Sequence, residues 1–197
     1  MRIFYLMPLL LLGFMNSHSQ NKKFEALLQK GNLTFKMPDN FDTLAVVNNP
    51  DMNYELALKS KTKDLEIRYA IRPLKERIEQ FEQKQKDTSS KMFAGAHPNK
   101  IYQTVFLTVI MNTSGNHQQV PGFKSFPPEA VKREFNAGWG ATTVYPLKSV
   151  FGKGYSNCML VTLHRDDQAD AYIFYLFNNK EDLTTALPAF HALTFSN

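Results

Sequence analysis

The pattern of hydrophobic and polar positions is clearest between residues 157 and 177. Two apolar segments of strand length flank a short polar stretch there, which is typical of a β-hairpin. Pairing Arg165 with Asp170 across a four-residue loop places Val161 opposite Phe174. Both faces of this pair are then mostly apolar, whereas a sheet with one solvated face alternates apolar and polar residues. We therefore predict that this hairpin is central in a sheet covered on both sides.

A second hairpin is predicted over residues 54–72, with a polar turn at its centre. One register places Leu58 opposite Ile67 on an apolar face and Lys59 opposite Glu66 on a charged face, which we expect to lie at the surface. A slip of one residue would destroy both faces, so the pattern specifies the register. The same register gives the further pairs Leu56–Tyr69, Tyr54–Ile71 and Ala57–Arg68, with Glu55 diagonal to Arg68.

The rest of the chain alternates between expected strands and helices. Strands are expected at residues 33–37, 44–47 and 142–147, and helices at residues 21–30, 74–86, 127–135 and 181–195, the last one kinked at Pro188. Residues 100–112 favour a buried helix capped by Asn99, with an apolar stripe of Ile101, Val105 and Val109, but their β-branched residues leave a strand over 102–111 as a rival. The fold class is therefore α+β: an antiparallel sheet flanked by helices, in a single domain over residues 20–197.

The N-terminus has the pattern of a secretory signal peptide over residues 1–19. A basic start is followed by an apolar run from Ile3 to Phe14 and by small residues at Ser17 and Ser19. The run is short for a spanning helix, which needs about 20 apolar residues, so an uncleaved anchor is the weaker alternative. No later segment is apolar enough to span a membrane. We expect a secreted or periplasmic protein of the cell envelope, with no integral membrane segment after cleavage.

Charge and cysteine usage exclude several classes. The net charge is +5 with both signs interspersed, and no basic stripe or matching motif predicts nucleic-acid binding. Cys158 is the only cysteine, so no disulfide forms within the chain. Its place in a predicted central strand favours a small buried hydrophobe over a reactive thiol. We expect a monomer.

Few polar residues have the spacing of a catalytic or metal site. Asp166, Asp167 and Asp170 crowd one loop, but they do not match a calcium-binding loop, and a turn closed by an Arg165–Asp170 pair explains them better. His164 is interpreted as a core or rim residue of the hairpin. The other histidines, His97, His117 and His191, also lack metal-site spacing. No nucleophile motif is present, so we predict no catalytic residue, no metal and no cofactor.

The best candidate site is aromatic. Trp139, the only tryptophan, lies between two glycines, which would allow a tight helix-to-strand turn and leave the ring exposed. The neighbouring irregular segment, residues 112–127, carries Phe123, Phe126 and His117. Aromatic residues rimmed by polar groups suit a ligand or partner surface. The alternative is that Trp139 fills the core and the two phenylalanines hold the loop in place.

The order of elements resembles the Mog1/PsbP-like family. The resemblance rests on the opening residues 33–38 (Leu-Thr-Phe-Lys-Met-Pro), on hairpins with intervening helices, and on the ending at residues 192–195 (Ala-Leu-Thr-Phe). It implies an antiparallel sheet sandwiched between helices and a non-catalytic role in binding or assembly. Family members include photosystem accessory proteins, a small-GTPase cofactor and secreted bacterial proteins of unknown role. No functional residue is carried over.

Three functions remain open. The first is a non-enzymatic binding or accessory module that contacts an unknown protein or a small apolar ligand around Trp139. The second is a carrier of an apolar ligand, in line with 16 phenylalanines and 8 methionines. The third is a small envelope hydrolase with a dispersed site. A pocket with converging histidine, aspartate or arginine would favour the enzyme, an apolar cavity the carrier, and a shallow aromatic patch the binding module.

Overall fold

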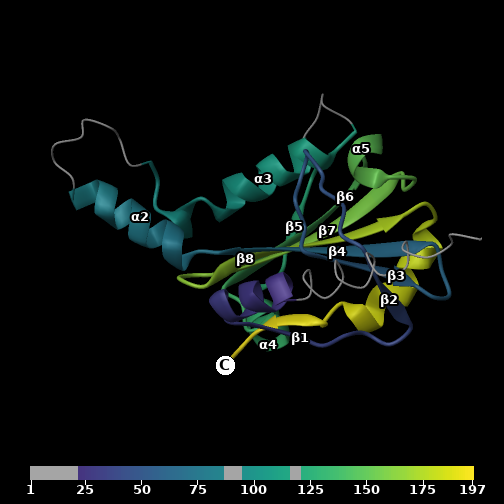
Figure 1. The fold of residues 1–197 in the computed structure, drawn as a ribbon, viewed down its shortest axis with the longest axis horizontal. Coiled ribbons are helices and arrows are strands. Elements are labelled where there is room, and N and C mark those ends of the chain that lie inside the picture. The colour runs from purple at the N-terminus through teal and green to yellow at the C-terminus, as the bar shows by residue number, and fades with distance from the viewer. Residues whose placement is uncertain (1–21, 87–94, 116–120) are drawn as a thin grey trace, which may run out of the picture.

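The protein is built on a seven-stranded antiparallel sheet. The computed structural model describes residues 22–86, 95–115 and 121–197, so the expected signal peptide lies outside the described residues. The strands follow the order β2 (Phe41–Leu44), β3 (Leu56–Ser60), β4 (Leu65–Pro73), β8 (Ala169–Phe177), β7 (Asn157–Arg165), β6 (Trp139–Pro146) and β5 (Lys124–Ser125) (Figure 1). A separate two-stranded sheet joins β1 (Leu33–Phe35) to β9 (Leu193–Phe195).

Helices cover both faces of the sheet, which confirms the predicted α+β fold. One face carries α3 (Tyr102–Thr113) and α5 (Ser149–Gly152), and we call it the α3 face (Figure 1). The other, the α4 face, carries the helical residues 22–30, α4 (Pro128–Phe135), the β1–β9 pair and the 3₁₀ helix η2 (Lys180–Ala189). Helix α2 (Lys75–Lys86) has no buried residue and projects from the end of the sheet, as a polar surface helix does.

The central hairpin β7–β8 is buried on both faces as predicted, and every residue of β8 is buried. The predicted register is wrong by one residue. Arg165 pairs with Ala169, so Val161 lies opposite Ile173 instead of Phe174. The connecting loop has three residues instead of four, because Asp167 adopts a left-handed conformation with φ of 63°. A left-handed residue is what a three-residue hairpin loop requires, and aspartate tolerates it better than most residues.

The hairpin β3–β4 has the predicted register inside its strands. The predicted pair Tyr54–Ile71 is wrong, because Tyr54 packs in the core of the α3 face and Ile71 in that of the α4 face. The prediction that its charged face lies at the surface is wrong, because α5 packs against it. Arg68 is buried, and its guanidinium lies 4.9 Å from the ring centres of both Tyr54 and Phe151. Its Nε donates to Glu66 at 2.6 Å, and an Nη donates to the Phe151 carbonyl. Aromatic rings and hydrogen bonds thus replace water around this buried charge.

Residues 102–113 form the predicted helix and not the rival strand. Asn99 does not cap it, because Asn99 lies in the short 3₁₀ helix η1 (Pro98–Lys100) and Ile101 takes the cap position. The side chain of Asn99 instead donates to Asp167 at 2.7 Å and accepts its backbone N–H at 3.1 Å, which fastens the β7–β8 turn to η1. The face of α3 toward the sheet differs from the predicted stripe and consists of Phe106, Val109, Ile110 and Thr113.

Three further boundaries differ from the prediction. The strand expected at 44–47 is β2, which lies three residues earlier, and the strand expected at 142–147 begins already at Trp139. The last expected helix ends at Ala189, and the chain then enters β9. The short strand β9 pairs with β1, a long-range contact that local helix propensity does not report.

Candidate functional site

One end of the α3 face carries a row of polar and aromatic side chains across four strands. The register pairs Trp139 of β6 with His164 of β7, His164 with Asp170 of β8, and Asp170 with Arg72 of β4. Directly paired residues lie on the same face of a sheet, so these four side chains are neighbours. We call them the polar row.

His164 is held on three sides. Its Nδ1 lies 2.7 Å from a carboxylate oxygen of Asp170, and its Nε2 lies 2.9 Å from one of Asp166. The ring of Tyr102, from α3, stacks on the imidazole with 4.0 Å between ring centres. Burial by itself lowers the pKa of His164, but the hydrogen bonds to Asp170 and Asp166 outweigh it, and the pKa is raised.

This arrangement, the His164 clamp, favours an imidazolium. Only the protonated ring has two N–H donors for two carboxylates. Both nitrogens are then occupied, so His164 has no free lone pair with which to accept a proton from a substrate. The clamp joins Asp166 at the hairpin tip to Asp170 in the sheet and to Tyr102 on α3, and we interpret it as structural.

Next to the clamp, four rings from β6, α3 and the segment before β5 form an aromatic cluster. Trp139 is half-buried, with its ring centre 5.0 Å from that of Tyr102 and 5.8 Å from that of Phe106. The ring of Phe123 meets Phe106 edge-on at 5.3 Å, and Phe123 is 42% exposed. The rings of Tyr102 and Phe106, both on α3, pack against those of Trp139 and Phe123. The cluster is therefore held on its α3 side and reaches solvent at Phe123 and, in part, at Trp139.

The predicted site residues separate into three groups. Trp139 and Phe123 belong to the aromatic cluster. Phe126 lies on the α4 face, where its ring packs 6.3 Å from that of Phe135 and 6.4 Å from that of Phe190. His117 lies outside the described residues. The sheet itself separates Phe126 from Trp139, so these two residues do not share a surface.

The two glycines beside Trp139 do not make a turn. Neither Gly138 nor Gly140 has a positive φ, and Trp139 is the first residue of β6. A Cβ at position 140 would lie 3.0 Å from a ring carbon of Phe126 and 3.2 Å from the Thr162 carbonyl oxygen. Gly140 therefore permits close packing of Phe126 against the sheet.

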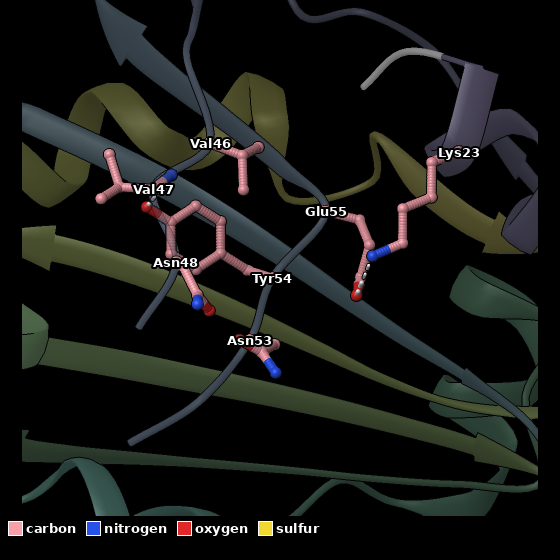
Figure 2. Close-up of a pocket in the computed structure, with 7 residues that line it drawn as sticks. All are labelled: Lys23, Val46, Val47, Asn48, Asn53, Tyr54 and Glu55. Atoms are coloured by element: carbon pink, nitrogen blue, oxygen red, sulfur yellow. Dashed lines mark hydrogen bonds and ion pairs between the residues drawn. The ribbon is translucent and has the colours of Figure 1, made fainter. Parts of the chain in front are cut away.

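Beyond Arg72, the polar row ends at a pocket of about 350 Å³ (Figure 2). Glu55 points toward Lys23 at one side of it, with 4.0 Å between carboxylate and amine. The carboxylate of Glu55 is buried and accepts from Arg72 at 3.0 and 3.1 Å and from the Ile71 N–H at 3.1 Å. Glu55 therefore pairs with Arg72 and not with Arg68, the residue to which the sequence places it diagonal. This carboxylate is committed to structural contacts.

A second pocket, of about 340 Å³, lies on the α4 face beside β2. Its lining is mostly apolar and consists of Phe24, Glu25, Leu28, Phe35, Met37, Thr43 and Leu56. The helical residues 22–30 contribute Phe24, Glu25 and Leu28, which follow one another at helical spacing. The opposite wall comes from β1, β2 and β3.

The remaining histidines of the described chain have local partners. His97 accepts from the backbone N–H of Asn99 at 3.2 Å, and His191 bonds Glu134 at 2.8 Å. Among the described residues, no group of three or more histidine, cysteine, aspartate or glutamate side chains is placed to hold a metal ion. Within the same ranges no helix combines the length and apolar character needed to cross a membrane.

The sequence did not single out the residues that build the site around Trp139. Tyr102 and Phe106 are four residues apart, which on a helix predicts a shared face, but residues 100–112 also read as a strand. The pairing of His164 with Asp170 depends on the hairpin register, and the predicted four-residue loop pairs Asp170 with Arg165 instead. No protein-family model and no curated protein matches the chain.

Proposed function

We propose that the chain is exported to the cell envelope and acts there as a non-enzymatic binding or accessory module, with the aromatic cluster as its contact surface. The observation that carries the proposal is the open side of that cluster. Phe123 is exposed and Trp139 is partly exposed, while the rings of Tyr102 and Phe106 on α3 pack against them.

Such a surface suits a protein partner for two physical reasons. Large aromatic side chains supply most of the free energy at many interfaces, and tryptophan is prominent among them. A ring already held by its neighbours loses little conformational entropy on binding. Trp139 begins a strand and packs on α3, so the surface is preorganised.

The neighbouring polar groups support binding over catalysis. His164 is the buried histidine nearest the cluster, and both its nitrogens are engaged by carboxylates. Glu55 at the other end of the polar row is engaged by Arg72 and a backbone N–H. The resemblance to Mog1/PsbP-like proteins stays a prediction, and it points to the same non-catalytic role.

The test compares three immobilised proteins: the wild type, Phe123→Ser and Val150→Ser. Val150 is 52% exposed on α5 and serves as the matched control for loss of an exposed apolar side chain. Envelope extract is passed over each, and captured proteins are identified by mass spectrometry. We expect a protein retained by the wild type and by Val150→Ser but lost with Phe123→Ser. The same retained set on all three proteins would refute the proposal.

A second readout uses Trp139, because it is the only tryptophan of the chain. Addition of the purified captured protein, in a tryptophan-free variant, should shift the emission of Trp139 as water leaves its ring. Unchanged emission at saturation would place the contact elsewhere on the molecule. Equal melting temperatures of the three proteins show that the substitution acts on the surface and not on the fold.

A further inference from the structure

Strand β2 is the last strand at its edge of the seven-stranded sheet. The Lys61 N–H donates to the Asn40 carbonyl at 2.9 Å, which sets the alternation of hydrogen bonds between β2 and β3. By this alternation Phe41 and Thr43 direct their backbone N–H and C=O groups away from β3. These outward groups have no hydrogen-bond partner within residues 22–86, 95–115 and 121–197.

The apolar pocket of about 340 Å³ adjoins this edge. Thr43 belongs to both, since it lies in the edge strand and lines the pocket. Phe24 and Phe35 form part of the wall, and their rings pack edge-on against each other at 5.3 Å and against Tyr69 behind them at 6.3 and 5.2 Å. The wall is therefore packed in place without a ligand.

We propose that an extended peptide segment of a partner protein adds as a strand alongside β2 and inserts one large apolar side chain into this pocket. Free backbone groups at a sheet edge recognise an extended chain, and a pocket beside the edge selects one of its side chains. Alternate residues of the added strand face the α4 side of the sheet, where the pocket lies.

Charge and size favour a peptide over a free fatty acid. Glu25 lines the pocket and would repel a carboxylate head group. The volume is near the lower end of the range for ligand pockets, about 300 Å³, which limits the occupant to one side chain or a small apolar molecule. A small apolar molecule would leave the backbone groups of Phe41 and Thr43 unused.

This surface is distinct from the aromatic cluster, because β2 and β5 are opposite edges of the sheet. Short edge strands with charged residues resist pairing with arbitrary chains, and the ion pair of Asp42 with Lys61 at 3.0 Å has that effect here. The pocket then decides which chains bind, because only a segment with a suitable apolar residue gains from it. The basic probe below also complements Asp42 and Glu25.

The probes are fluorescein-labelled six-residue peptides with amidated ends and the sequence Lys-Thr-X-Thr-Val-Lys, in which X is Leu, Phe, Met or Ser. Binding is measured by fluorescence anisotropy. We expect saturable binding for at least one apolar X and none for Ser. No saturable binding of the three apolar probes up to millimolar protein overturns the proposal.

Two variants distinguish the backbone edge from the pocket. Thr43→Pro removes an outward N–H and keeps the bonds of β2 to β3, so it should weaken binding about fivefold, whereas Thr43→Ser keeps the N–H and should bind like the wild type. Leu28→Trp fills the pocket and should abolish the preference for apolar X. Far-UV circular dichroism confirms the fold of each variant.

Three results would overturn the proposal. Equal affinity of Thr43→Pro and Thr43→Ser would mean that the pocket alone binds a small apolar group. A wild-type dimer in sedimentation that Thr43→Pro dissociates would identify a second copy of this chain as the occupant of the edge. Loss of peptide binding in Phe123→Ser would assign the binding to the aromatic cluster. If Phe123→Ser binds the peptide normally, a failure of the function proposed above leaves this inference standing.

Discussion

Replacement of His164 by leucine should reveal how much the His164 clamp contributes to stability. The side chain of Asp170 is 2% exposed, and His164 is the partner of its carboxylate. Arg72 lies opposite Asp170, but its guanidinium is bound to Glu55 and to the Asn53 carbonyl. His164→Leu therefore leaves a buried carboxylate without a counter-charge, and removing one member of a buried pair costs about 3–5 kcal/mol.

Two matched variants give the scale. The carboxylate of Asp166 is 64% exposed, so Asp166→Asn should cost at most about 1 kcal/mol although it also removes a charge from the clamp. The double variant His164→Leu/Asp170→Val removes both buried charges and keeps the site filled. Since an apolar replacement of a buried pair is often close to neutral, the double variant should recover most of the loss caused by His164→Leu alone.

The pH dependence follows from the raised pKa of His164. A histidine whose pKa is higher in the folded state contributes its full stabilisation below its unfolded pKa of about 6.5 and loses it as the pH rises through the folded value. The stability of the wild type relative to the double variant, which lacks the His164 imidazole and its buried partner, should therefore be greatest near pH 5.5 and should fall toward pH 9.

The assay is urea unfolding followed by the emission of Trp139, which pairs with His164 across β6 and β7, and by circular dichroism for the whole fold. Coincident transitions would show that both signals report one unfolding event. A loss below about 1 kcal/mol for His164→Leu would refute the claim that the carboxylate of Asp170 depends on the histidine. A stability difference that grows with pH would refute the imidazolium.

Three further outcomes are expected from local geometry. Burial raises the pKa of the Cys158 thiol to about 12, so a disulfide reagent at pH 8 should label the native protein only as fast as it unfolds, and faster labelling would contradict its burial. Gly140→Ala should destabilise the fold by about 1–3 kcal/mol in urea unfolding, because the added Cβ would lie 3.0 Å from a ring carbon of Phe126. Gly138→Ala should change little, because its Cβ would lie 3.6 Å from the nearest atom, the His164 carbonyl oxygen, which is an ordinary contact. Arg68→Met should cost about 3–5 kcal/mol in the same assay, because it leaves the largely buried carboxylate of Glu66 without its partner. A cost near zero would mean that water hydrates this carboxylate in the variant.

The sequence predicts a register only where the two faces of a hairpin differ. In β3 and β4 one face is apolar and the other carries charges, so a slip of one residue has a visible cost, and the four predicted pairs from Leu56–Tyr69 to Lys59–Glu66 are correct. The burial of that charged face was not predictable, because α5, which covers it, is distant in sequence. Arg68 was therefore assigned to solvent, although it lies between the rings of Tyr54 and Phe151.

The central hairpin shows the opposite case. Both faces of β7 and β8 are apolar, so a slip of one residue leaves the hydrophobic pattern almost unchanged. The same pattern predicts that the hairpin is central, which is correct, and cannot predict which residues of its two strands pair. Burial follows from composition, whereas the pairing follows from the conformation of the loop.

The residues around Trp139 are only partly visible in the sequence for a related reason. The sequence groups Trp139 with the aromatic residues of the adjoining loop, and Trp139 and Phe123 do meet around Phe106. Phe126, from the same loop, lies on the other face. In a strand the face of a residue depends on its parity relative to its neighbours, so a correct boundary for β6 is needed before Trp139 can be placed, and the sequence places that boundary three residues too late.

The left-handed conformation of Asp167 therefore determines the chemistry at this end of the sheet. With φ of 63° at Asp167 the loop closes in three residues, and His164 lies opposite Asp170. With a four-residue loop Arg165 would take that place, and the carboxylate would have a permanently charged partner instead of a titratable one. Asn99 supports this choice, because it binds both the backbone N–H and the side chain of Asp167. A polar contact from η1 thus selects the hairpin register, and the register in turn places an imidazole beside Trp139.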